Sequence, residues 1–227
     1  MGKFVRKNKF LVVVVCLFVL FTSMYATVVF VASRDYNGIT IVLDAGHGGR
    51  DGGSIGANGP IEKEINLEYV LALKEKLVQS GYKVILTRST DDGLYSNLAT
   101  NKKQDDMNKR MDIIKKVNPN LVVSLHMNSF PDSSAYGAMT YYRSGDEASK
   151  NCADLIQSSI STYCNARSKE SKEGDYFMLN CSYYTSVLIE CGFISNPNEE
   201  SMLNSEEYKN RMVDSIYKGI LLYFGEV

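Results

Sequence analysis

Short, continuous apolar runs recur along this chain, and each ends at a polar or glycine-rich position. Runs of this kind, rich in β-branched residues, are typical of buried strands that end in loops. They predict strands over residues 41–43, 82–87, 121–125 and 185–189, with a further candidate over 138–142. The glycine-rich segment after the first run predicts an open loop at that strand end.

Between these runs the apolar residues recur at helical spacing. One predicted helix covers residues 62–79, and another covers about residues 106–117. A third follows Asp146, whose side chain is expected to cap it, and the last begins after Ser205. The expected inner positions of the first and last of these helices are Leu67, Val70, Leu71, Leu77, Val78, Met212, Val213, Ile216, Ile220 and Phe224. Because strand, helix, strand crossovers place strands parallel, this alternation predicts one α/β domain: a three-layer sandwich with a mostly parallel twisted sheet and helices on both faces.

The amino-terminal pattern differs from the rest of the chain. Basic residues gather within residues 1–9, and residues 10–32 contain no charged side chain. About 20 apolar residues cross a bilayer, whereas the apolar part of a secretory signal usually has about 7–15, so this run predicts one uncleaved transmembrane helix. The alternative is a signal peptide cut after Ala26 or Ala32, but a large side chain stands two positions before each alanine, against the small-residue cleavage rule.

These boundaries predict the organisation of the whole chain. Residues 1–9 are expected to be a cytoplasmic basic tail, 10–32 a transmembrane anchor, 33–38 a tether and 39–227 a single folded domain. The basic flank should keep the amino terminus in the cytoplasm. The prediction is therefore a single-pass membrane protein whose folded domain lies outside the cytoplasm.

Charge and cysteine content narrow the possible partners. The 25 Lys and Arg nearly balance the 26 Asp and Glu, so no overall field would attract nucleic acid. Of the five cysteines, the four beyond the anchor would be able to pair in an oxidising compartment, and their spacing fits no metal knuckle. Cys152 and Cys164 lie on one predicted helix about 18 Å apart, too far to bond each other. Other pairings, with Cys181 and Cys191, stay open.

Chemically capable side chains stand where the predicted strands end. The chain has two histidines, His47 and His126, and each follows an apolar run, as Glu190 does. Glu62 and Glu64 begin the helix after the glycine-rich loop. Catalytic zinc commonly takes three nitrogen or oxygen ligands and leaves a fourth position for water. Two histidines and one carboxylate suit such a site, and a second carboxylate is left to transfer protons. The spacing alone does not separate Glu62 from Glu64.

Structural roles remain open for the same residues. A histidine at a strand end is commonly a hydrogen-bonded surface residue, and a glutamate at a helix start complements the positive end of that helix. Glu190 also fits a buried structural carboxylate, and Asp44 fits a strand-terminating turn residue or a group that orients a metal ligand. Cys191, next to Glu190, should point to the other face of its strand and pack there.

Four motifs in order, LDAGHGGRDGG, IEKEINL, SLHMNS and IECGFISN, lie between residues 41 and 196. They resemble those of the zinc-dependent N-acetylmuramoyl-L-alanine amidases, which cut the amide between the lactyl group of muramic acid and the first alanine of the peptidoglycan stem peptide. The resemblance implies that His47, Glu62 and His126 bind Zn²⁺ and that Glu190 is the catalytic carboxylate. Ala45 stands where proline is common in the family, which alters the loop but no ligand.

The segment NKKQDDMNKR, the expected single anchor and the lack of wall-binding repeats resemble the spore-cortex amidases. This resemblance implies a role in sporulation and germination, through removal of peptides on the way to muramic-δ-lactam, and a catalytic domain that faces the cell wall or spore cortex. The polar segment 88–104 is expected to be a functional or mobile loop and 169–175 a mobile loop. An accessory protein that assists metal binding is a further expectation.

Two other functions fit the same residues. One is a catalytically silent wall-binding module that has kept the fold, although all four chemical positions are filled. The other is a zinc peptidase or deacetylase, because metal ligands fix the type of reaction better than the substrate. Metal content, activity on muropeptides and analysis of the products would separate the three.

Overall fold

A six-stranded sheet lies at the centre of the protein, in a computed structural model that describes residues 14–19, 36–180 and 183–226. Its strands lie in the order β2-β1-β3-β6-β4-β5. All neighbouring strands are parallel except β4 and β6, which are antiparallel. The strands are β1 (Thr40–Ala45), β2 (Lys83–Leu86), β3 (Leu121–Asn128), β4 (Met139–Tyr142), β5 (Lys172–Glu173) and β6 (Ser186–Phe193). The α/β prediction is confirmed, with a mixed sheet.

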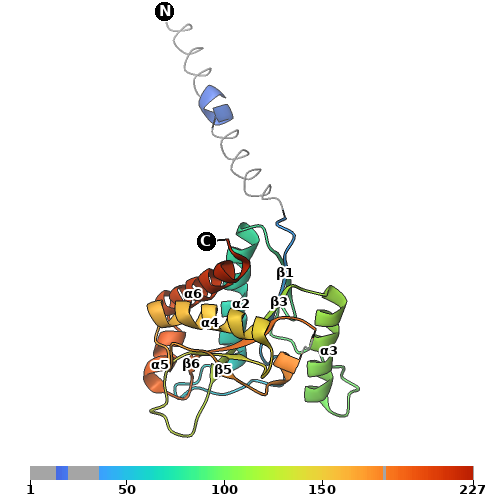
Figure 1. Cartoon of the computed structure of the whole chain (residues 1–227), viewed down its shortest axis with the longest axis vertical. Coiled ribbons are helices and arrows are strands. Elements are labelled where there is room, and N and C mark those ends of the chain that lie inside the picture. Colours follow the sequence, from blue (N-terminus) through green and yellow to red (C-terminus); the bar gives the residue numbers. More distant parts are fainter. Residues whose placement is uncertain (1–13, 20–35, 181–182, 227) are drawn as a thin grey trace, which may run out of the picture.

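Helices cover both faces of this sheet unequally (Figure 1). The larger core packs one face against α2, α4 and α6, and the smaller core packs the other against α3 and a 3₁₀ helix, η1. The helices are α2 (Glu62–Gln79), α3 (Lys102–Val117), α4 (Glu147–Tyr163), η1 (Phe177–Asn180), α5 (Pro197–Leu203) and α6 (Glu206–Phe224). Fewer helices therefore pack against the α3 face.

Strand alternation places polar side chains on the α3 face. In β1, Leu43 and Ala45 pack in the larger core, whereas Val42 belongs to the smaller one. Because successive side chains point to opposite faces, Asp44 follows Val42 onto the α3 side. Cys191 packs in the larger core, as expected, which leaves Glu190 on the α3 side as well. The polar residues of the central strands therefore gather on one face.

Helix boundaries follow local sequence signals closely. The range of α2 agrees with the prediction, and Asp146 and Ser205 cap α4 and α6 through their side chains. α3 begins four residues earlier than expected, at Lys102, because the Asn101 side chain accepts a hydrogen bond from the Gln104 backbone N–H and caps the helix there.

Some predicted inner positions are wrong, and some elements were not predicted. Leu71 and Val78 were expected on the inner face of α2, but they are 40% and 47% exposed, while Tyr69 and Leu73 are buried. β3 and β6 continue past their predicted ends because they pair with each other that far. α5 was not anticipated, and β5 lies within the predicted loop 169–175.

The prediction of a membrane anchor is wrong on the residues that the structure describes. No described helix is long and apolar enough to cross a bilayer. Within the predicted anchor, 10–32, only residues 14–19 are described, as a short helix, and the rest of that range and residues 1–9 lie outside the described part. A spanning helix needs about 20 residues. The predicted localisation as a single-pass membrane protein is therefore also wrong on the described residues.

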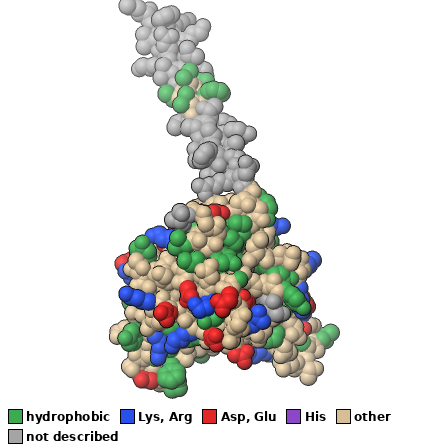
Figure 2. Space-filling model, viewed as in Figure 1, with side chains coloured by type: hydrophobic (Ala, Val, Ile, Leu, Met, Phe, Trp, Pro, Cys, Tyr) green, Lys and Arg blue, Asp and Glu red, His purple; other side chains and the backbone are tan. Residues whose placement is uncertain are grey.

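Acidic and basic side chains are interspersed over the face shown in Figure 2, in keeping with the net charge of −1.

Among the described residues, Cys16, Cys152, Cys164 and Cys191 are free thiols. Cys181, for which the sequence left pairing open, lies outside the described ranges.

Candidate metal and catalytic centre

His47 lies in the loop that follows β1, with a left-handed backbone (φ 63°). Its Nε2 is 3.1 Å from Glu62 Oε1, and its Nδ1 is 3.0 Å from Asp51 Oδ1. The Arg110 guanidinium donates to the His47 carbonyl and so holds this uncommon backbone conformation. Burial alone would lower the pKa of His47, but the carboxylates of Glu62 and Asp51 raise it overall. Both ring nitrogens of His47 thus face a carboxylate oxygen.

His126 lies on β3, beside the loop that carries His47. Its Nδ1 is 3.1 Å from the same Glu62 Oε1, and the two imidazole rings meet edge to face with centroids 5.1 Å apart. The ring lies against Gly46, where a Cβ atom would overlap it. Glycine at position 46 is therefore required by the close approach of the His126 ring.

Glu62 is the first residue of α2 and is buried, whereas Glu64 is exposed. Its Oε1 accepts from the Met127 backbone N–H (3.2 Å), and its Oε2 accepts from the Ser54 N–H (2.9 Å). Burial alone would raise the pKa of Glu62, but hydrogen bonds from His126 and His47 and their charge lower it well below its ordinary value. The structure thus brings Glu62, and not Glu64, to the two histidines.

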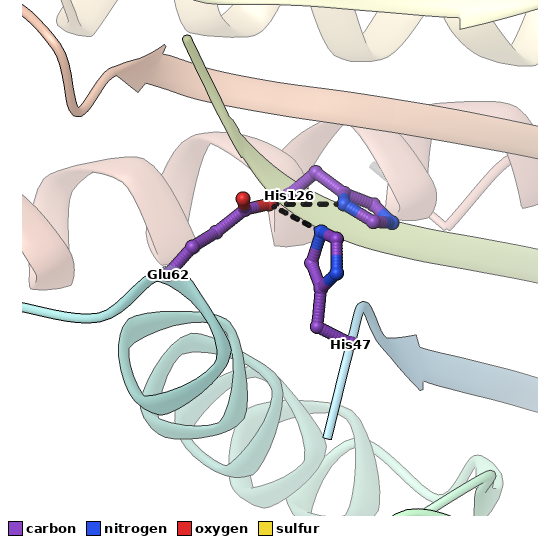
Figure 3. Close-up of side chains that lie close together, drawn as sticks. All are labelled: His47, Glu62 and His126. Carbon is purple, nitrogen blue, oxygen red and sulfur yellow. Dashed lines mark hydrogen bonds and ion pairs between the residues drawn. The ribbon is translucent and has the colours of Figure 1, made fainter. Parts of the chain in front are cut away.

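The three side chains converge from different elements: a loop, a helix start and a strand (Figure 3). One ligand atom from each of His47, Glu62 and His126 lies within 4.8 Å of the other two. Two imidazole nitrogens and one carboxylate oxygen are the donor set of many catalytic metal sites. With a single carboxylate oxygen facing both nitrogens, these residues fit one metal ion.

Glu190 lies on β6 at the position that pairs with His126 of β3. It is 7% exposed, and its Oε2 is buried without a hydrogen-bond partner among the described residues. Burial, with the nearby charge of Glu62, raises the pKa of Glu190 to about 7, although His126 and His47 act in the opposite direction. A carboxyl group in this state exchanges protons near neutral pH, as general acid–base catalysis requires.

Asp44 belongs to a hydrogen-bonded network that supports the centre. Its carboxylate accepts from Thr87 Oγ1 (2.7 Å), Ser124 Oγ (2.6 Å) and Arg110 Nη1 (2.6 Å). Burial alone would raise the pKa of Asp44, but Arg110 and these hydrogen bonds lower it to about 2. Asp44 is therefore an ionised, fully bonded residue, and it reaches the His47 loop through Arg110.

Sequence reasoning missed three residues of this region. Arg110 binds Asp44 and Asp106, and Arg88 donates to the backbone carbonyls of Ala45 and Gly46. The third is Asp51, beside His47. Signals were present: Arg110 follows Asp106 by one helical turn, and Asp51 stands four residues after His47.

Comparison with known proteins agrees with this geometry. The family model described as N-acetylmuramoyl-L-alanine amidase matches residues 41–221. The germination-specific N-acetylmuramoyl-L-alanine amidase of Bacillus subtilis (strain 168) is 33% identical over 199 residues, which cover 86% of this chain and 83% of that protein.

Solved structures show the same fold. The CwlD amidase from Clostridioides difficile, in complex with the GerS lipoprotein, superposes with a TM-score of 0.79 at 36% identity, over 83% of this chain and 99% of that one. The catalytic domain of CwlV from Bacillus (Paenibacillus) polymyxa var. colistinus superposes with a TM-score of 0.73 at 30% identity, over 83% and 99% of the two chains. This chain belongs to the N-acetylmuramoyl-L-alanine amidase family.

Proposed function

We propose that this peptidoglycan amidase cleaves the bond between the lactyl group of N-acetylmuramic acid and L-alanine with one Zn²⁺ held by His47, Glu62 and His126. The proposal rests on the geometry of four side chains. Two imidazole nitrogens, each 3.1 Å from one buried carboxylate oxygen, lie beside Glu190, whose Oε2 has no hydrogen-bond partner in the described structure. The centre thus offers three metal donors and a separate group for proton transfer.

Glu190 performs the proton transfers in this proposal. Zn²⁺, when bound, lowers the pKa of water towards ~7 and polarises a carbonyl. Glu190 accepts the proton of the attacking water as the oxygen bonds to the lactyl carbon, and it returns that proton to the amide nitrogen as the carbon–nitrogen bond breaks. The products are a lactyl carboxylate and a peptide with a free amino-terminal alanine. In the metal-free protein, burial raises the pKa of Glu190 to about 7, within the range that general acid–base catalysis uses.

Asp51 and Arg110 keep the metal ligands in position. The Asp51 carboxylate, 3.0 Å from His47 Nδ1, orients the ring so that Nε2 faces Glu62. Arg110 fixes the backbone of the same loop through the His47 carbonyl. Loss of either residue should loosen the site without removing a ligand.

The biological setting that we propose is maturation of the spore cortex. A relative of this chain is a germination-specific amidase, and the similar CwlD structure is an amidase in complex with a lipoprotein. Removal of the peptide leaves a free lactyl carboxylate, which muramic-δ-lactam formation needs. The lipoprotein complex of that similar structure supports an accessory partner protein for this chain.

For the domain organisation, we propose that residues 39–227 form the catalytic domain. The family match over 41–221 and a sheet that begins at Thr40 support these limits.

Product analysis tests the proposed reaction. The metal-loaded protein is incubated with intact peptidoglycan, and the released fragments are identified by mass spectrometry. The expected products are peptides that begin with alanine, together with glycan that keeps its acetyl groups. Peptides cut internally would indicate a peptidase, deacetylated sugars would indicate a deacetylase, and binding without products would indicate a silent wall-binding module.

A further inference from the structure

A cavity of about 430 Å³ opens beside the candidate metal centre. His47 and His126 are among its lining residues, together with side chains of α3 and η1. The apolar part of the lining includes Met107, Phe177 and Leu188. A substrate whose scissile bond lies at the metal ligands would therefore place the part on one side of that bond in this cavity.

Most charged groups in the lining are already paired. Asp44 and Asp106 are both hydrogen-bonded to Arg110. Asp51 contacts His47 and, at 3.8 Å, Lys103. These acidic groups leave little negative charge free to face a ligand.

Two cations of the lining are not neutralised. Arg50 and Lys102 line the cavity, and neither forms an ion pair with a described residue. Lys102 Nζ lies 5.4 Å from the centre of the Tyr95 ring, which keeps the ammonium group at the cavity wall without a counter-charge. An anionic ligand would supply the missing partner.

We propose that this cavity takes the stem peptide of the substrate and that Arg50 and Lys102 bind a free carboxylate of that peptide. The inference rests on the proposed amidase function. Stem peptides combine small alanine side chains with acidic residues, which matches an apolar wall that carries two free cations. Arg50 and Lys102 would then determine specificity without taking part in proton transfer.

A second cavity provides an internal control. It has a volume of about 610 Å³, and Tyr176 lines both cavities. Its lining includes Lys172, an exposed residue of β5, but not His47 or His126. Lys172→Gln therefore removes the same charge as Lys102→Gln from the neighbouring cavity.

The test uses two synthetic muramoyl peptides that differ only at an acidic residue, which carries either a free carboxylate or its amide. The wild-type chain should show a KM roughly 5–10-fold lower for the carboxylate form, as expected for a charge-assisted hydrogen bond. Lys102→Gln and Arg50→Gln should each reduce this preference by raising KM for the carboxylate form. Lys172→Gln should keep the full preference.

Two results would overturn the proposal. One is equal KM for both substrates in the wild-type chain, which would leave the amidase function intact. The other is loss of the preference in Lys172→Gln but not in Lys102→Gln, which would assign the peptide to the second cavity. Cleavage of neither substrate by the metal-loaded chain would instead overturn the proposed function, and this inference with it.

Discussion

Two groups of ionisable side chains lie on the same face of the sheet, and they differ in how completely they are bonded. In the Asp44 network, both carboxylate oxygens accept hydrogen bonds, and the Arg110 charge is shared between Asp44 and Asp106. In the centre around His47 and His126, one oxygen of Glu62 faces two imidazoles, and Glu190 Oε2 has no partner among the described residues.

This difference separates the charges that stabilise the fold from those that are available for chemistry. A buried polar group that is fully bonded stabilises one conformation, and a buried group without a partner costs free energy. The pKa values of Asp44 and Glu190 differ in the same way: that of Asp44 falls to about 2, whereas that of Glu190 rises to about 7.

Glu190→Gln should nearly abolish turnover. The amide keeps the shape of the side chain but cannot accept the proton, and general acid–base catalysis is commonly worth about 10²–10⁴ in rate. The measurement is kcat on a soluble muropeptide. Glu64→Gln, at an exposed position on α2, is the control and should retain full activity. Substantial activity in Glu190→Gln would assign Glu190 a structural role.

Asp44→Asn should destabilise the fold strongly. It removes the charge that faces buried Arg110, and breaking one partner of a buried ion pair costs about 3–5 kcal/mol. Denaturant unfolding measures the change. Asp91→Asn is the matched control, because the Asp91 side chain is 58% exposed and its ion pair with Lys63 should contribute less than about 1 kcal/mol. Similar losses of unfolding free energy in the two variants would show that the buried Asp44–Arg110 pair contributes no more than an exposed ion pair.

Glu190→Gln should also change how stability depends on pH in the metal-free protein. The folded state keeps the proton of Glu190 to about pH 7, whereas an unperturbed glutamate releases it near 4.5. The folded chain therefore binds more protons in this window, and wild-type stability should fall as pH rises from about 4.5 to 7 and stay low above it. The variant should lack this fall, which amounts to about 3 kcal/mol.

Free energies of unfolding at pH 4, 6 and 8 measure this effect. Below pH 4.5 the two proteins should show no difference from Glu190 ionisation. A wild-type stability that rose relative to the variant between pH 4.5 and 7 would show that the folded state stabilises the ionised carboxylate instead.

Asp51→Asn should weaken metal binding while the fold stays intact. Groups that orient a ligating histidine are commonly worth about 10–100-fold in metal affinity, and Asp51 lies 3.0 Å from His47 Nδ1. Competition with a chelator measures the affinity. Asp112→Asn, at an exposed position on α3, should leave it unchanged. Equal affinity in both variants would place Asp51 outside the metal centre.

Much of this arrangement follows from local sequence signals. The range of α2 and the caps at Asp146 and Ser205 depend on residues close in the chain, and they were predicted correctly. The sequence motifs identified His47 and His126 as candidate metal ligands. Spacing did not separate Glu62 from Glu64, because both lie in the first turn of α2 and only the packing of that helix buries Glu62.

What the sequence missed depends on contacts between distant residues. Arg110 binds Asp44 across 66 positions, and no local pattern reports that contact. The extent of β6 past Glu190 is set by pairing with β3, and β5 is a two-residue strand at the edge beside β4. Arg50 and Lys102 have no ion-pair partner among the described residues because nearby carboxylates contact other cations: Asp44 binds Arg110, and Asp51 contacts Lys103. These pairings form only in the folded chain.

The two buried glutamates of the centre have different proposed roles, Glu62 as a metal ligand and Glu190 as the proton carrier. The direct measurement is zinc stoichiometry, by elemental analysis after equilibrium dialysis, of the wild-type chain, Glu62→Gln and Glu190→Gln. We predict about one zinc per chain in the wild type and in Glu190→Gln, and a marked loss in Glu62→Gln. Full zinc in Glu62→Gln, or loss of zinc in Glu190→Gln, would contradict the account.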